Sequence, residues 1–98
     1  MITITRRNDC ITISGHAGYA EPGKDIVCAA VSTLAQTLIK SVVSFSTDLI
    51  EYDMMPGWVH IKFWSLSSES RTLVDSFFCG LDMISFEYPD HVQIKTKL

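Results

Sequence analysis

The chain has 98 residues, of which 47% are hydrophobic, and it carries a net charge of -3 at pH 7. This length predicts a single domain over residues 1–98 with a modest hydrophobic core. A net negative charge argues against direct nucleic-acid binding, which needs a basic surface. The three cysteines lie far apart and no metal-binding motif joins them, so neither a disulfide framework nor a structural zinc site is expected.

The N-terminal residues 1–5 lack the basic-then-apolar layout of a signal peptide. The longest apolar stretch, residues 26–45, contains Gln36, Lys40 and several hydroxyl side chains, which argues against a membrane span. Unpaired cysteines suit a reducing compartment. These features predict a cytoplasmic protein with no membrane partner.

The chain begins with a predicted hairpin. Residues 2–5 and 11–14 alternate apolar with polar side chains, which is typical of half-buried strands. Residues 6–9, Arg-Arg-Asn-Asp, supply the turn between them. Residues 15–24 hold three glycines and a proline, and this composition predicts a loop.

A long helix is predicted next, with Asp25 as its N-cap and its end near Phe45. Its apolar side chains cover most of its circumference, so the helix should be buried on more than one side. In so small a chain the second covering surface can belong to another copy. The helix therefore favours a homodimer.

A second hairpin follows, with strands at residues 49–53 and 58–64 and a turn at Pro56-Gly57. One face of its second strand carries a large patch made of Trp58, His60, Lys62 and Trp64. If that face is open, the patch is large enough to bind a ligand. Packing against a helix or a second subunit is the favoured interpretation.

Ser67 or Ser68 can cap a second helix, which ends at Tyr88-Pro89-Asp90. Polar and apolar residues alternate at 91–95, and this pattern predicts a last strand. The order of elements is therefore β-β-α-β-β-α-β. This order predicts an α+β fold, with both helices packed on a mainly antiparallel sheet.

Candidate catalytic residues flank the glycine-rich loop. His16 directly follows a predicted strand, and Cys28 occupies the third position of the predicted helix. Free N–H groups and the dipole at a helix start favour a thiolate, and a nearby His can take the thiol proton. The same N–H groups can hold an oxyanion. On spacing alone, Cys28 can equally be a small core residue and His16 a surface residue.

Two further side chains have open roles near Cys28. Asp25 can serve only as the helix cap, or it can also orient His16. Ser32 lies one turn beyond Cys28, so its hydroxyl can reach the surroundings of the thiol. It can instead bond to its own helix backbone, as serines in helices often do.

The loop itself suits a lid over this pair. Gly18, Tyr19 and Gly23 are its candidate substrate contacts, although Tyr19 can instead pack down onto the protein. The loop does not end in Gly-Lys-Ser or Gly-Lys-Thr, so a nucleotide site is not expected.

The segment from Gly15 to Ser32 resembles the signature of the ribosomal-processing cysteine protease Prp family. The match consists of Gly-His-Ala at 15–17, a loop, and Asp-Ile-Val-Cys-Ala-Ala-Val-Ser at 25–32. The resemblance implies an endopeptidase that removes an N-terminal extension from the large-subunit ribosomal protein whose N-terminus reaches toward the peptidyl-transferase centre. The cut follows an aromatic residue, usually Phe. No metal or organic cofactor is implied.

The resemblance also implies roles for single residues. His16 and Cys28 would be the catalytic dyad, and Gly15, Asp25 and Ser32 would support it. The loop would be mobile and order around the substrate. Family members are homodimers packed through helices, so the resemblance implies the same for this chain.

Three alternatives remain open. The chain could be a phage-type relative that processes virion proteins bearing the same cleavage motif. A non-catalytic module could dock on a ribosomal protein and use Cys28 only in packing. A redox-sensing thiol is disfavoured, because no resolving cysteine lies near Cys28 in the sequence.

Overall fold

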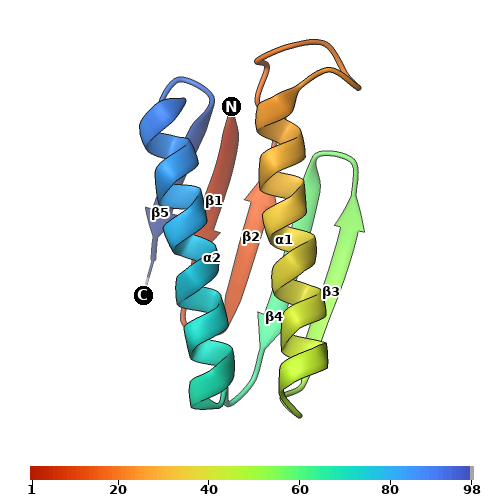
Figure 1. The fold of residues 1–98 in the computed structure, drawn as a ribbon, viewed down its shortest axis with the longest axis vertical. Coiled ribbons are helices and arrows are strands. Elements are labelled where there is room, and N and C mark those ends of the chain that lie inside the picture. Colours follow the sequence, from red (N-terminus) through yellow and green to blue (C-terminus); the bar gives the residue numbers. More distant parts are fainter. Residues whose placement is uncertain (98) are drawn as a thin grey trace.

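A computed structural model describes residues 1–97 and arranges them as a sheet with both helices on one face (Figure 1). The elements are β1 (Ile2–Arg6), β2 (Cys10–Ser14), α1 (Ile26–Phe45), β3 (Ile50–Met55), β4 (Trp58–Phe63), α2 (Ser68–Glu87) and β5 (Val92–Thr96). The predicted α+β class and the predicted order of elements are confirmed.

Five strands form the sheet within the described residues, in the order β3-β4-β2-β1-β5. All neighbouring pairs are antiparallel except β1 and β5, which run parallel. The parallel pair arises because α2 carries the chain back along the sheet before β5 begins. The strands β3 and β5 are the two edges of the sheet.

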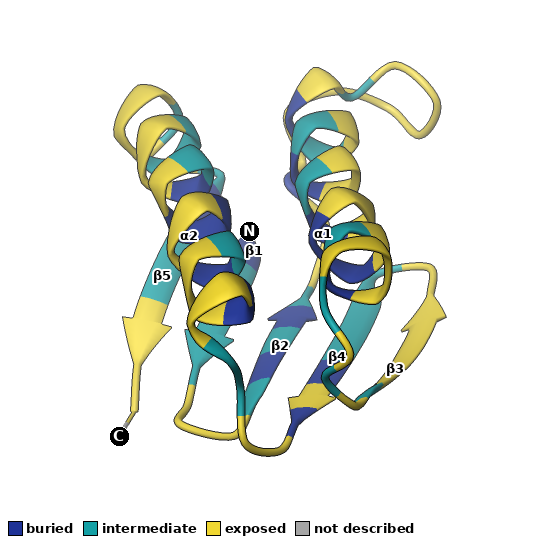
Figure 2. Cartoon of the chain, turned by 60° about the horizontal axis from the view of Figure 1, so that its bottom comes forward, coloured by how far each residue is buried: buried dark blue, intermediate teal, exposed yellow. Residues whose placement is uncertain are grey.

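The hydrophobic core lies between the sheet and the helices (Figure 2). Ile4, Ile11 and Ile61 project from the three central strands and are at most 1% exposed. The helix α1 contributes six buried side chains: Val27, Val31, Ala35, Leu38, Ile39 and Val42. Alternation in the strands and the 3.6-residue period of α1 thus place both apolar surfaces against each other.

By length and composition alone, α1 is able to cross a membrane, a criterion that core helices also satisfy. The sequence predicted that Gln36 and Lys40 would argue against a span, but the helix meets this criterion despite them. Its buried face packs within the core, so the apolar composition of α1 has a structural explanation.

The patch of Trp58, His60, Lys62 and Trp64 lies on the sheet face that the helices leave open, so packing against a helix was the wrong expectation. Both helices cover the opposite face, because that face carries the apolar side chains of Val59, Ile61 and Phe63. Trp58 stacks on His60, with ring centroids 5.7 Å apart.

Candidate active site

The loop between β2 and α1 and the first turns of α1 enclose a cavity of about 560 Å³. It is lined by His16, Gly18, Ala20, Pro22, Gly23, Asp25, Cys28, Ala29 and Ser32. The structure therefore brings all the sequence-predicted site residues to this cavity except Gly15 and Tyr19. The loop lies above the N-terminal end of α1, close to the β3–β4 turn (Figure 1).

The carboxylate of Asp25 is bound on both sides. Its Oδ1 accepts hydrogen bonds from the N–H groups of Val27 and Cys28, at 3.0 and 2.9 Å. Its Oδ2 accepts from the N–H groups of Tyr19 and Ala20, at 2.9 and 3.2 Å. These donors, above all the Cys28 N–H, hold the pKa of Asp25 below its ordinary value. Asp25 thus caps α1 and ties the loop to it.

Asp25 makes no hydrogen bond to His16 within residues 1–97, so the structure gives no support to an orienting role for it. All four N–H donors to its carboxylate come from the helix start and the loop. Of the two roles that the sequence left open, the observed hydrogen bonds support the helix cap.

Cys28 lies half-buried at the third residue of α1. Its Sγ accepts a hydrogen bond from the Ala17 N–H at 3.3 Å. The N–H groups of Val27 and Cys28, expected from the sequence to be free for an oxyanion, are already bonded to Asp25. The Ala17 N–H is therefore the backbone donor that contacts the Cys28 sulfur directly.

His16 is exposed and lines the same cavity as Cys28, although no hydrogen bond joins the two side chains in residues 1–97. Its carbonyl oxygen accepts from the Met1 amino group at 2.6 Å. Its ring lies against the β3–β4 turn, because a Cβ atom built on Gly57 would be only 2.7 Å from His16 Nε2. The neighbouring Gly15 N–H donates to the Gly57 carbonyl at 2.9 Å.

Two glycines are required at these contacts. Gly15 and Gly57 have φ angles of 95° and 75°, which side chains rarely adopt. A Cβ on Gly15 would collide with the Met1 carbonyl. The Pro56-Gly57 turn is evident in the sequence, but no sequence pattern connects it to His16.

Tyr19 turns away from the cavity. Its ring meets the rings of Tyr88 and His91 edge-on, at centroid distances of 5.3 and 5.5 Å. His91 Nδ1 also lies 2.8 Å from the Ala17 carbonyl oxygen, which fits an N–H donor on that nitrogen. The loop is therefore anchored to the segment before β5, a contact between distant residues that the sequence did not indicate.

Ser32 lies exposed on α1, one turn beyond Cys28, and lines the cavity. Its neighbours along the helix, Thr33 and Thr37, donate their hydroxyls back to the helix backbone. Ser32 has no such side-chain bond in the described part of the chain. Its hydroxyl is therefore available to a molecule in the cavity.

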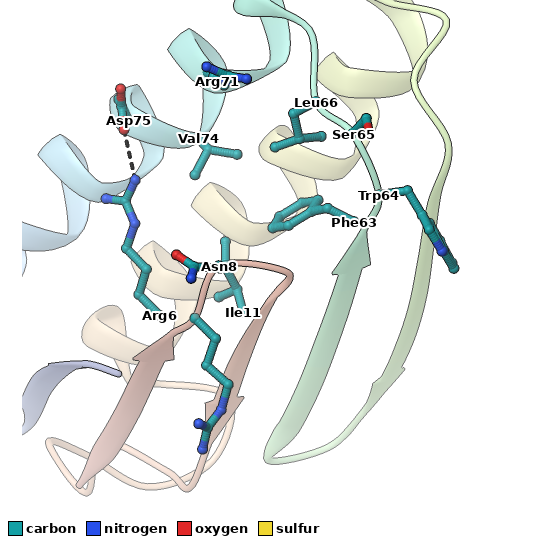
Figure 3. A pocket seen from close by; sticks show the side chains of 11 residues that line it. Arg6, Asn8, Ile11, Phe63, Trp64, Ser65, Leu66, Arg71, Val74 and Asp75 are labelled. Carbon is teal, nitrogen blue, oxygen red and sulfur yellow. Dashed lines mark hydrogen bonds and ion pairs between the residues drawn. The ribbon is translucent and has the colours of Figure 1, made fainter. Parts of the chain in front are cut away.

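A second cavity, of about 450 Å³, is bordered by the three arginines of the chain, Arg6, Arg7 and Arg71 (Figure 3). Arg6 pairs with Asp75 at 2.8 Å and lies over the Phe78 ring, so its guanidinium ties β1 to α2. No cysteine or histidine is among the described residues that line this cavity. It therefore lacks the thiol and the imidazole that the first cavity contains.

The family profile of cysteine protease Prp matches residues 1–93. The chain belongs to the Prp family. A ribosomal processing cysteine protease Prp of Bacillus subtilis is 27% identical, over 98% of this chain and 96% of its own length. One from Mycoplasma genitalium is 31% identical, over 96% of this chain and 94% of its own length.

The fold agrees with this assignment. A crystal structure of the Staphylococcus aureus ribosomal processing protease Prp, in complex with a covalently linked product peptide, superposes with a TM-score of 0.94 at 22% identity. The match covers 99% of this chain and 100% of that one. As a Prp family member the chain is a cysteine protease, and the cavity with Cys28 and His16 is its candidate active site. Within residues 1–97, no group of three His, Cys, Asp or Glu side chains is placed to hold a metal ion.

Replacing Asp25 with Asn should separate its two contacts. The amide oxygen still accepts from the helix start, but the amide NH₂ group cannot accept from the loop. We expect faster hydrogen exchange at the Tyr19 and Ala20 amides, with the Val27 and Cys28 amides still protected, as measured by NMR. Equal loss of protection at both places would contradict a separate clamp on the loop.

The same variant should change the acid stability. Because hydrogen bonds from the helix start and the loop hold the pKa of Asp25 below its ordinary value, the ionised carboxylate stabilises the fold. That stabilisation is present in full above the unfolded pKa and is lost as the pH falls through the lower, folded pKa. Asp25→Asn should therefore weaken the decline of Tm in this acidic range. Part of the acid-induced decline of Tm should remain in this variant, because hydrogen bonds, above all from the Ser67 hydroxyl, also lower the pKa of Asp48.

Proposed function

We propose that this protease removes the N-terminal extension of a large-subunit ribosomal protein precursor, with Cys28 as nucleophile and His16 as base. The observation that carries the proposal is the shared cavity: a thiol at the start of α1 and a histidine just after β2 line one space of about 560 Å³. A thiol nucleophile needs a base within reach, and catalytic hydrogen bonds often form only when substrate is bound.

The chemistry is acyl transfer. His16 takes the proton of Cys28, and the sulfur attacks the carbonyl carbon of the scissile peptide bond. The Ala17 N–H, which lies against the sulfur, is the candidate donor to the oxyanion. The C–N bond then breaks and the leaving amine takes the proton from His16. Water hydrolyses the resulting thioester and frees Cys28.

The cavity favours a large side chain beside the cut. Gly18, Ala20, Pro22 and Gly23 form its loop wall, and none of them has a long side chain to fill the space. This supports cleavage after an aromatic residue. The relatives are named for ribosomal processing, and one S. aureus structure is of Prp with a substrate peptide.

The protein should act in the cytoplasm, where ribosomes assemble. Cys10, Cys28 and Cys79 are free thiols in the structure, which suits a reducing compartment.

A homodimer is proposed through the outer faces of the helices. A groove of about 600 Å³ between α1 and α2 is lined by Ile26, Ala30, Leu34, Met83 and Ile84 among others. Ile26 and Met83 are 57% and 70% exposed in the single chain. Burying such surface against a second copy removes it from water. Ala29 lines both this groove and the catalytic cavity, so the two adjoin.

Mass spectrometry of a synthetic peptide spanning the extension junction tests the activity. We expect the unaltered protein to cut after the aromatic residue and Cys28→Ala to leave the peptide intact. His16→Ala should lower kcat at least about a hundredfold, because it removes the base. The matched controls Cys10→Ala and His60→Ala should retain activity.

The outcomes separate the alternatives. Cleavage by Cys28→Ala would overturn the assignment of the nucleophile. A peptide left intact by the unaltered protein would overturn the ribosomal substrate. A panel of virion precursors would then distinguish a phage-type protease from a binding module.

Replacing Met83 with Lys tests the dimer. A charge in the apolar groove should convert the dimer to a monomer, as measured by sedimentation equilibrium. Met55→Lys is the matched control, since Met55 is also exposed but lies on the sheet. A monomeric unaltered protein, or equal behaviour of both variants, would contradict this interface.

A further inference from the structure

A pocket lies between α1 and the edge strand β3, and its lining on α1 begins one helical turn beyond that of the catalytic cavity. It has a volume of about 480 Å³ and is lined by Gln36, Ile39, Lys40, Val43, Ser44, Tyr52 and Met54. We call it the α1–β3 channel. Lys40 is the one charged residue in this lining, so the surface is mainly apolar and uncharged.

The helix wall of the α1–β3 channel leads directly to the nucleophile. Cys28, Ser32, Gln36 and Lys40 follow one another at intervals of four residues, so they lie along one side of α1. The first two line the catalytic cavity and the last two line the channel. The two spaces are therefore consecutive along the same helix face.

The strand wall leads to the histidine. Tyr52 and Met54 pair with Ile61 and Val59 of β4, so their side chains point to the helix side of the sheet. After β3 the chain turns at Pro56-Gly57, and Gly57 is the residue that lies against the His16 ring. Followed along the chain, one wall of the α1–β3 channel thus leads toward Cys28 and the other toward His16.

The outer side of β3 has no strand partner among the described residues. Its apolar side chains are also exposed: Tyr52 is 51% exposed and Met54 is 42% exposed. An exposed edge strand offers backbone donors and acceptors to an added strand. An extended peptide that binds in this way can place alternate side chains into one groove.

We propose that the α1–β3 channel binds the substrate segment next to the scissile bond, as an extended apolar peptide added to the edge of β3. The proposal rests on the proposed function, because the scissile bond must lie at Cys28. The helix wall from Cys28 to Val43 measures roughly 22 Å at 1.5 Å per residue, which matches about six or seven extended residues. Lys40 disfavours a basic side chain in this stretch.

A pair of matched variants tests the channel. Met54→Lys places a cation in it, whereas Met55→Lys places one on the opposite face of the same strand. We expect Met54→Lys to lower kcat/KM for the junction peptide at least about tenfold, mainly through KM, and Met55→Lys to change it less than about twofold. Alkylation of Cys28 by iodoacetamide should keep its rate in both variants.

A binding measurement separates this inference from the cleavage chemistry. The junction peptide is titrated into ¹⁵N-labelled Cys28→Ala protein, which should bind without cutting. The amides of Tyr52 and Met54 should shift and gain protection from exchange, and those of the other edge strand, β5, should not. Shifts confined to β5, no shifts in β3, or equal kinetics of the two Met variants would overturn the channel, even if the protein cuts the peptide.

Discussion

The Asp25 carboxylate is the contact on which the site depends. Two N–H groups from the start of α1 and two from the loop converge on its two oxygens. A neutral side chain at this position could not accept all four donors. Because the helix start carries Cys28 and the loop forms the cavity wall, one carboxylate fixes Cys28 relative to the cavity.

The two candidate catalytic side chains are held by different parts of the fold. Cys28 is placed by α1 and its cap, whereas His16 is placed by the end of β2, the Met1 amino group and the β3–β4 turn at Gly57. Bringing them into one cavity therefore requires the sheet register and the packing of α1 on the sheet. The core contacts of strands and helix, together with the hydrogen bond from the Ala17 N–H to the Cys28 sulfur, set the relative position of the thiol and the imidazole.

This division explains what could be predicted from the sequence. The alternation in residues 2–5 and 11–14 and the Asp25 cap are local patterns, and they gave the elements and the place of Cys28. The Gly57–His16 and His91–Ala17 contacts join residues far apart in the chain, so no local pattern encodes them. The open sheet face at Trp58 depended on where both helices pack, which a strand pattern does not contain.

The apolar side chains of α1 lie on three parts of its surface, each in a different environment. Val31, Ala35 and Val42 face the core, Ala30 and Leu34 line the groove beside α2, and Ile39 and Val43 line the α1–β3 channel. A helix that is apolar on most sides therefore does not imply a second copy on every uncovered side. One open side suits the proposed partner subunit and the other the proposed peptide, and the candidate active site lies at the first turns of the helix.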